Sequence, residues 1–456
     1  MWPSSAACRT GRRRFLDPPR FPAQNARAPM RALLLCLCLV ATALAATGDE
    51  GALAGHRHRV LVTTDIGGTD PDDYQSLVHL LLYADVLELE GLVSSPFERP
   101  GRDAILEVIA AYAQDYPRLR THDARYPTPE ALRVMTRQGG LRPAPASGLR
   151  GPTEGSAWIV ACARRPDPRP LHVLVWGALE EVAQALHDAP DILPRLRVYY
   201  IGGPNKKWGP DAYQFLVEHF PTLWIIEANS TYRGYFLGGR QDGDWGNAAF
   251  VRSRVAGQGA LGAYFAQHLG GVLKMGDTPS VNWLLRGHPD DPGAPGWGGR
   301  FVRAWERPTA RFARLTTAAD RVELFSIVEL VLPLGPNAPA QPTGQLRITN
   351  QVLDGHPDGA GNLRFRFCPR DPVLFRYELR SNAPALDGRT GEITAVSPPP
   401  ERAREPAVRH PHWWTDDPSA AEAEGIHHGA RTVSRWREDY LRDFATRLAR
   451  GAAPAR

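Results

Sequence analysis

The stretch Arg59-Val60-Leu61-Val62-Thr63-Thr64-Asp65-Ile66-Gly67-Gly68-Thr69-Asp70-Pro71-Asp72-Asp73 decides the fold. Its apolar residues 60–62 are typical of a strand in the middle of a sheet. Gly67-Gly68 permits a sharp turn. The apolar pattern that follows, through Tyr83, predicts a helix. A strand, a tight turn and a helix in this order indicate an α/β protein.

Four aspartates fall within nine residues of this stretch. Helix capping explains three of them, because Asp70 is a good N-cap before Pro71 and the pair Asp72-Asp73 suits the positive end of a helix dipole. Capping does not explain Asp65, which ends the strand where open α/β sheets bind ligands. A hard cation would offset the charge of all four. The residues alone leave a cation site and a well-capped helix as two open interpretations.

Strands and helices continue to alternate along the chain. Strands are expected at 87–95, 171–177, 196–203 and 223–227, and helices at 102–116, 178–188 and 211–219. The strand at 171–177 lacks polar alternation, which is typical of a sheet covered on both faces. We therefore predict a mostly parallel central sheet flanked by helices, over residues 56–305.

The pattern changes near Arg307. Short β-type runs at 321–332, 345–351, 363–367 and 373–379 are separated by turn residues and predict a β-rich module over 306–400, built as a small sandwich. Residues 401–450 are expected to form a loop and then an amphipathic helix at 431–450 that packs back on the α/β domain.

Residues 1–45 read as an N-terminal extension and a signal peptide. Met30-Arg31 precedes a short apolar run, and Ala43-Leu44-Ala45 resembles a cleavage site. The apolar run is too short to span a bilayer. We therefore expect a secreted or periplasmic protein with no membrane partner.

The formal charge of +5 comes from the leader, which holds seven Arg and one Asp. Of the 54 basic and 49 acidic residues, 47 and 48 remain after it, so no basic excess argues for nucleic acid. The sequence leaves open whether the protein forms a homo-oligomer. Cys162 and Cys368 are the two cysteines beyond residue 45, and either one disulfide or two buried thiols would fit them.

These motifs resemble the nucleoside hydrolase superfamily, and most closely its secreted branch, the cellulose-binding-protein-like nucleoside hydrolase domain of bacteria. That branch has Thr-Thr-Asp-Ile-Gly, an Asp-Asp pair and a Leu-Leu-Leu-Tyr run, as residues 63–83 do here. It also has Gly-Asp-Thr-Pro-Ser, found at 276–280, Trp-Gly-Gly-Arg, found at 297–300, and a final helix like that at 435–447. The resemblance covers residues 58–305 and 431–450.

The resemblance implies a calcium site whose oxygen ligands come from Asp65, Asp72, Asp73, Asp277 and the carbonyl of Trp176. By the same resemblance, Asn205 in the segment Gly202-Gly203-Pro204-Asn205 would bind a sugar hydroxyl. Asp70 and Asn229, the latter at a strand end, are further candidates for substrate binding. Asp65 would accept a proton from a calcium-bound water that attacks the anomeric carbon.

Three features depart from other hydrolases of the superfamily. The pair Asp72-Asp73 follows Asp65 after a longer loop, Gly203 replaces a glutamate, and Gly276 replaces a histidine.

The expected function is that of a secreted, calcium-dependent hydrolase of N-glycosidic or related sugar bonds, acting on a small sugar-containing substrate. The alternative is a non-catalytic protein that binds a cellulose-like polysaccharide. Tryptophans beside the metal would favour the second, and those available are Trp208, Trp245, Trp283 and Trp297, although core packing also fits them.

Overall fold

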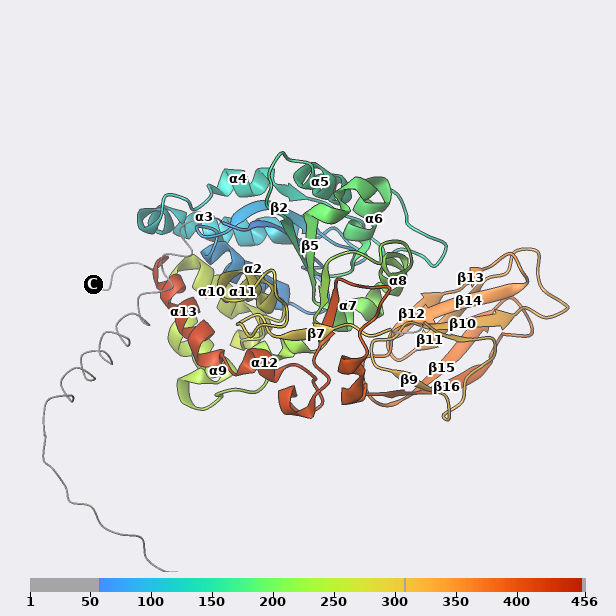
Figure 1. Cartoon of the computed structure of the whole chain (residues 1–456). Coiled ribbons are helices and arrows are strands. Elements are labelled where there is room, and N and C mark those ends of the chain that lie inside the picture. The colour runs from blue at the N-terminus through green and yellow to red at the C-terminus, as the bar shows by residue number, and fades with distance from the viewer. Residues whose placement is uncertain (1–56, 307–308, 453–456) are drawn as a thin grey trace, which may run out of the picture. The chain divides into compact units, whose positions relative to one another are not determined.

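Eight strands form the central sheet of the structure, a computed structural model that describes residues 57–306 and 309–452 (Figure 1). Their order is β3-β2-β1-β4-β5-β6-β17-β7. All neighbours are parallel except β17 and β7. The bounds are β1 (Arg59–Thr64), β2 (Glu88–Ser94), β3 (Thr136–Arg137), β4 (Leu171–Trp176), β5 (Leu196–Tyr200), β6 (Ile225–Glu227), β7 (Phe301–Arg303) and β17 (Trp413–Asp416). The predicted mostly parallel sheet is confirmed.

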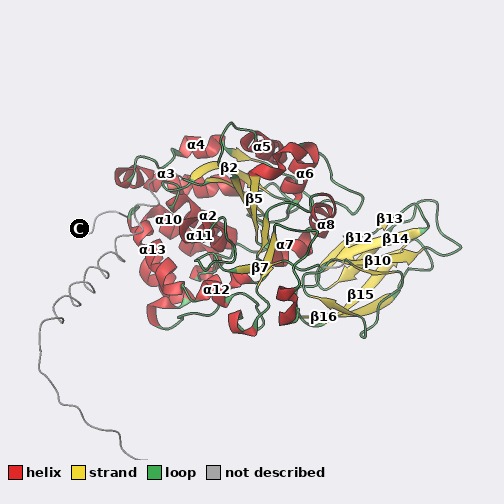
Figure 2. Cartoon of the chain, viewed as in Figure 1, coloured by secondary structure: helices red, strands yellow, loops and turns green. Residues whose placement is uncertain are grey.

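Helices cover both faces of this sheet (Figure 2). They are α2 (Asp72–Leu82), α3 (Arg102–His122), α4 (Pro129–Val134), α5 (Glu154–Ala163), α6 (Glu180–Asp188), α7 (Gly202–Trp208), α8 (Pro210–His219), α9 (Asn247–Phe250), α10 (Gly259–Gln267), α11 (Thr278–Arg286), α12 (Arg431–Ser434) and α13 (Arg437–Ala449). Shorter helical turns are η2 (Pro190–Arg195), η3 (Thr231–Tyr235), η4 (Gly243–Trp245), η5 (Val251–Val255), η6 (His268–Gly271), η7 (Pro400–Arg404) and η8 (Ala420–Glu422).

Strand β1 lies inside the sheet, and all of its residues are buried. It pairs with β2 on one side and with β4 on the other. Val60 and Val62 pack into a core cluster with α2, α3, α10, α11 and α13, whereas Leu61 packs into a second cluster with α5, α6 and α8. The unbroken apolar run is therefore explained by helices on both faces.

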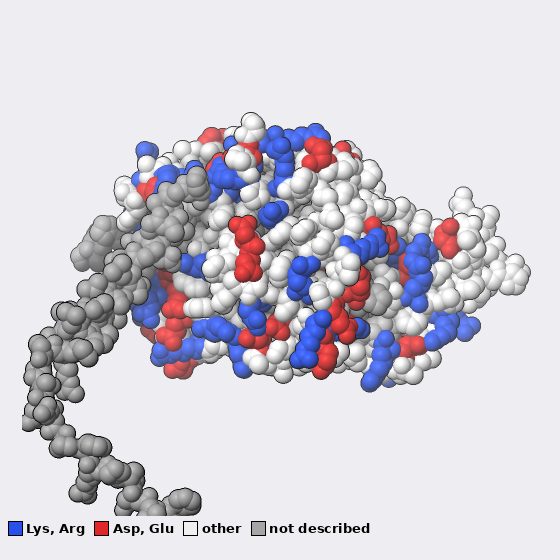
Figure 3. Space-filling model, in the orientation of Figure 1, with Lys and Arg blue, Asp and Glu red and all other residues white. Residues whose placement is uncertain are grey.

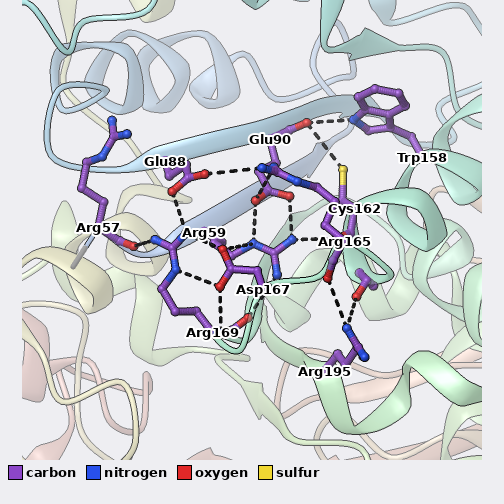
Figure 4. Close-up of polar contacts among 11 residues, drawn as sticks. Arg57, Arg59, Glu88, Glu90, Trp158, Cys162, Arg165, Asp167, Arg169 and Arg195 are labelled. Carbon is purple, nitrogen blue, oxygen red and sulfur yellow. Dashed lines mark hydrogen bonds and ion pairs between the residues drawn. The ribbon is translucent and has the colours of Figure 1, made fainter.

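A buried ion-pair network fixes the amino-terminal end of β1 (Figure 4). Arg59 is 1% exposed, and its Nε and Nη2 donate to the two carboxylate oxygens of Glu90 at 2.6 and 3.0 Å. Arg59 also donates to the carbonyls of Cys162 (2.6 Å) and Arg169 (3.1 Å), and Arg165 contacts Glu90 at 2.8 Å. The network joins β1, β2, α5 and the segment before β4, at the edge opposite Asp65.

The β-rich module, residues 309–400 here, contains two sheets that share one core. Their orders are β13-β14-β10-β8 and β12-β11-β15-β16-β9. The bounds are β8 (Ala310–Phe312), β9 (Arg321–Glu323), β10 (Val328–Pro333), β11 (Gly344–Ile348), β12 (Gln351–Asp354), β13 (His356–Pro357), β14 (Asn362–Phe367), β15 (Leu374–Ser381) and β16 (Thr390–Val396). The shared core gives the module the form of the expected sandwich.

Two predicted β runs are each divided in the structure. The run 321–332 breaks into β9 and β10, which belong to different sheets, at Phe325 with φ +63°. The run 345–351 turns back on itself between β11 and β12, where Thr349 has φ +51°. Positive φ is unfavourable for non-glycine residues, so the residue types at these two positions do not predict either turn.

The C-terminal segment completes the central sheet. Residues 413–416, which were expected to lie in a loop, form β17 between β6 and β7. Asp416 holds this strand by accepting hydrogen bonds from the backbone N–H groups of Ser230 (2.8 Å) and Thr231 (3.1 Å). The helix predicted at 431–450 is two helices, α12 and α13, and α13 packs back as expected through Arg447, whose Nη1 lies 2.5 Å from Asp85.

Three further observations concern the surface charge, the cysteines and the apolar character of the helices. Basic and acidic side chains are interspersed on the face drawn in Figure 3. Cys162 and Cys368 are both buried, and no disulfide joins them. Within residues 57–306 and 309–452, no helix is both long and apolar enough to cross a bilayer. The predicted leader, residues 1–45, lies outside the described residues.

Candidate metal centre

Three buried carboxylates meet at the carboxyl-terminal edge of the sheet. Asp72 and Asp73 are the first two residues of α2, and Asp277 immediately precedes α11. One carboxylate oxygen from each lies within 4.8 Å of the others, and the residues are 6%, 3% and 4% exposed. The fold thus brings together the two segments that the sequence singled out, which are more than 200 positions apart.

Asp65 follows β1 and lines the same cavity as these three acids, of about 190 Å³. It is the least buried of the four. The loop after β1 is fixed by Thr64, whose hydroxyl donates to Asp73 and accepts from the N–H of Ile66 at 3.1 Å. Gly177 makes room for this loop, since a Cβ there would lie 2.9 Å from the Asp65 nitrogen and 2.1 Å from Ser95 Oγ.

Three of the four carboxylates are buried and Asp65 is partly buried, so they repel one another with little screening by water. Burial and then the charge of Asp72 raise the pKa of Asp65 to about 7, although a hydrogen bond with Asp73 opposes this rise. Burial likewise raises the pKa of Asp72 to about 7, against the opposing charge of Lys274. For Asp73 and Asp277, burial and the neighbouring carboxylates raise the pKa well above its usual range.

The donor set fits a hard cation such as calcium. Asp277 Oδ2 is buried and has no hydrogen-bond partner within the described chain, which leaves it free to ligate. Trp176, the last residue of β4, lines the same cavity. Trp176 is tied to α11 because its indole N–H donates to Ser280 Oγ at 2.8 Å. These donors are all oxygens, with no histidine or cysteine among them, and calcium prefers such a set.

Of the residues expected to bind substrate, Asn205 and Asp70 line the cavity and Asn229 does not. The side-chain amide of Asn205 donates to the carbonyls of Trp176 (3.2 Å) and Ile201 (2.9 Å). Asn229 lies behind Gly203, in the lining of a neighbouring cavity, and its amide donates to Glu227 at 3.3 Å.

The expectation that Asp70 caps the helix is wrong. Helix α2 begins at Asp72 after Pro71, and no side chain caps its first turn. Asp70 is exposed at the mouth of the cavity and contacts Lys274, whose Nζ is also 3.6 Å from Asp72. Asp70 therefore forms an ion pair with Lys274 and does not cap α2.

Close packing explains two of the three departures from other hydrolases. A Cβ at residue 276 would lie 2.4 Å from Asp72 Oδ2, the atom that accepts a hydrogen bond from the Gly276 N–H at 3.0 Å. A Cβ at residue 203 would lie 2.2 Å from the Asn229 carbonyl. Neither site has room for a larger side chain with the backbone as it stands.

Sequence reasoning missed part of the cavity wall. Asn350 and Arg370 come from the β-rich module, and Lys207, Tyr232 and Lys274 from the α/β part. Trp208 also lines the cavity and is half-buried, whereas Trp245, Trp283 and Trp297 are not in its lining. One feature of the sequence could have pointed to this wall. The chain has only three lysines, at 206, 207 and 274, and two of them, Lys207 and Lys274, line the cavity.

A parallel sheet with helices on both faces and an acidic centre after β1 define a protein of the nucleoside hydrolase-like α/β class. The model of the family described as cellulose-binding Sde182, nucleoside hydrolase-like domain, matches residues 59–301. The chain belongs to this family, which confirms the resemblance seen in the sequence.

Solved structures similar to this chain carry related descriptions. A nucleoside hydrolase-related hypothetical protein from Saccharophagus degradans, associated with carbohydrate metabolism, is 20% identical over 75% of this chain and 100% of its own, with a TM-score of 0.47. An inosine-uridine preferring nucleoside hydrolase from Bacillus anthracis is 14% identical over 87% of this chain and 100% of its own, with a TM-score of 0.36. A search of curated proteins found no match. The assignment rests on the family match.

Proposed function

We propose that this protein is a calcium-dependent hydrolase of N-glycosidic or related sugar bonds. The observation that carries the proposal is the buried trio of Asp72, Asp73 and Asp277, with an unpartnered oxygen on Asp277 and with Asp65 in the same cavity. A structural protein has no use for four repelling carboxylates around an open cavity, whereas a metal-dependent hydrolase needs them.

In this proposal Asp72, Asp73, Asp277, Asp65 and the Trp176 carbonyl hold the ion. Bound calcium supplies a positive charge that orients a water and lowers its pKa.

The protein residues then have separate tasks. Asp65, the least buried carboxylate, accepts the proton of the attacking water. The remaining carboxylates favour the positive charge that develops on the sugar ring in an oxocarbenium-like transition state. Asn205 and Asp70 are placed on the cavity wall to bind sugar hydroxyls.

One observation favours the second candidate, a non-catalytic binder of a cellulose-like polysaccharide. Trp208 is half-buried and lines the cavity, and an indole in such a position can stack on a sugar ring. The description of the family also names cellulose binding. We further propose that the protein is exported, with residues 30–45 as the signal peptide.

The test compares metal-stripped and calcium-loaded protein on a panel of nucleosides and aryl glycosides, beside a cellulose pull-down. A hydrolase should turn over at least one substrate only with calcium, and Asp65→Asn should lower kcat about 100-fold or more. Asp115→Asn, a buried aspartate far from the cavity lining, is the matched control and should keep the activity. Calcium binding without turnover, together with retention on cellulose, would select the binding protein instead.

A further inference from the structure

The β-rich module contributes to the cavity that holds the carboxylates. Asn350, in the turn between β11 and β12, and Arg370, after β14, line this cavity together with Lys207 of α7. The same three residues line an adjoining cavity of about 270 Å³ between α7 and the module. They therefore stand where the two cavities meet.

The junction is held in place by hydrogen bonds and an ion pair. Lys207 Nζ donates to Asn350 Oδ1 at 2.6 Å, and Gln351 donates to the Lys207 carbonyl at 2.9 Å. Arg366 of the module contacts Asp211 of α8 at 2.9 Å. These contacts hold the wall that carries Lys207 and Asn350 in a fixed position beside the cavity.

Lys207 is a buried cation with no carboxylate partner among the described residues. It is 9% exposed, and its Nζ contacts an amide oxygen and lies 5.0 Å from the Trp208 ring centre. The neighbouring residue shows the contrast, because Lys206 is fully buried and lies 2.7 Å from a carboxylate oxygen of Glu227. A buried ammonium group normally needs an anion, and Lys207 lacks one.

A second cation faces the same space. Burial lowers the pKa of Lys207 first and the charge of Arg370 lowers it further, whereas the charge of Asp371 raises it, so both members of the Arg370–Asp371 pair lie within electrostatic reach of Lys207. Asp371 is the one carboxylate in the lining of the adjoining cavity, and it already contacts Arg370 at 3.3 Å. Two cations, Lys207 and Arg370, therefore line the adjoining cavity, whose lining holds the single carboxylate of Asp371.

We propose that Lys207 and Arg370 form an oxyanion subsite, so that the ligand of the acidic cavity is an acidic sugar, carrying a carboxylate, sulfate or phosphate group at the junction of the two cavities. Asn350 positions the Lys207 ammonium group for this contact. The inference deepens the proposed function and rests on it for the position of the sugar. It also gives the β-rich module a role in substrate specificity.

Calorimetric titration of the calcium-loaded protein with glucuronate and with glucose, at equal ionic strength, tests the carboxylate form. Glucuronate should bind about tenfold tighter than glucose or better, and Lys207→Met or Arg370→Met should reduce this preference to about twofold or less. Asn350→Asp should also remove it, because the new carboxylate pairs with Lys207. Arg376→Met, an exposed arginine on β15 outside both cavities, should leave it unchanged. An equal affinity for both sugars, or a preference that survives Lys207→Met and Arg370→Met, would overturn the inference for carboxylates.

Titration of the metal-stripped protein with sulfate tests the cations without sugar or calcium. Binding that Lys207→Met and Arg370→Met weaken about tenfold supports the subsite for sulfate and phosphate groups. If both titrations show no dependence on Lys207 and Arg370, the subsite does not exist. The proposed function is tested independently of the subsite. It is wrong if the protein binds no calcium, even when the sulfate titration still depends on Lys207.

Discussion

The substitution Asp277→Asn should stabilise the metal-free protein and remove its response to calcium. Two unit charges 4.8 Å apart, the outer limit for oxygens of the trio, repel by about 3.5 kcal/mol at an effective dielectric constant of about 20. The protein avoids part of this repulsion by keeping protons, so we expect a gain of about 2–4 kcal/mol in the free energy of unfolding at pH 8. The side chain keeps its shape, and the unpartnered Oδ2 gives up no hydrogen bond.

The gain should depend on pH in a defined direction. The folded-state pKa of Asp277 is raised above its unfolded value by burial and by the charge of Asp72. The folded protein therefore holds a proton that the unfolded chain releases as the pH rises above about 4, and stability falls with rising pH until the folded carboxyl ionises. Asp277→Asn should thus stabilise strongly at pH 8 and little at pH 4.

Denaturant unfolding of metal-stripped protein, with and without calcium, measures both effects. Calcium at about 1,000 times its dissociation constant should stabilise the unmutated protein by about 4 kcal/mol and the variant by less than about 1 kcal/mol. The advantage of the variant over the unmutated protein should therefore shrink by about 3 kcal/mol or more when calcium is added.

Asp115→Asn is the matched control for this experiment. Asp115 is buried outside the cavity, and its two carboxylate oxygens accept from the N–H groups of Ala260 (2.9 Å) and Leu261 (2.8 Å). Its substitution should cost about 1–2 kcal/mol with or without calcium, since an amide offers one acceptor oxygen. If Asp277→Asn destabilised the metal-free protein as Asp115→Asn does, or if calcium stabilised both proteins equally, the metal-centre reasoning would be refuted.

Three further predictions concern other parts of the structure. Arg59→Met should cost about 3–5 kcal/mol in urea unfolding because it leaves Glu90 buried, whereas Arg165→Met, half-exposed beside the same carboxylate, should cost less than about 1 kcal/mol. Burial first, and then the charge of Arg447, lower the pKa of His79 to about 3, so below pH 6.5 the unfolded chain binds a proton that the folded protein does not. His79→Leu should therefore reduce the stability lost between pH 7 and pH 4 by about 3 kcal/mol, as measured by urea unfolding at both values; an unchanged loss would contradict this. Gly177→Ala should weaken calcium binding about tenfold or more in calorimetry, because its Cβ would displace the Asp65 loop, and normal affinity would show that the loop adapts.

The sequence by itself determined the inner strands of the central sheet and pointed to Asp65 and Asp277 of the acidic centre. The run 60–62 is apolar at every position, and this pattern is readable because a strand covered by helices on both faces has no polar side. Asp65 stood out because helix capping left it without an explanation, and Asp277 was found by the resemblance of its motif.

Only the tertiary structure decided how the cavity is closed and which residues face it. Strand β17 has four residues and lies in the sheet through pairing with β6, nearly 190 positions earlier, so no local periodicity marks it. Asn229 followed a strand, as a ligand-binding residue does, but the close approach of Gly203 sets it behind the wall. Asn350 and Arg370 reach the cavity because two separately patterned segments pack together. Their contribution depends on the free energy of long-range packing, to which residues close in sequence give no guide.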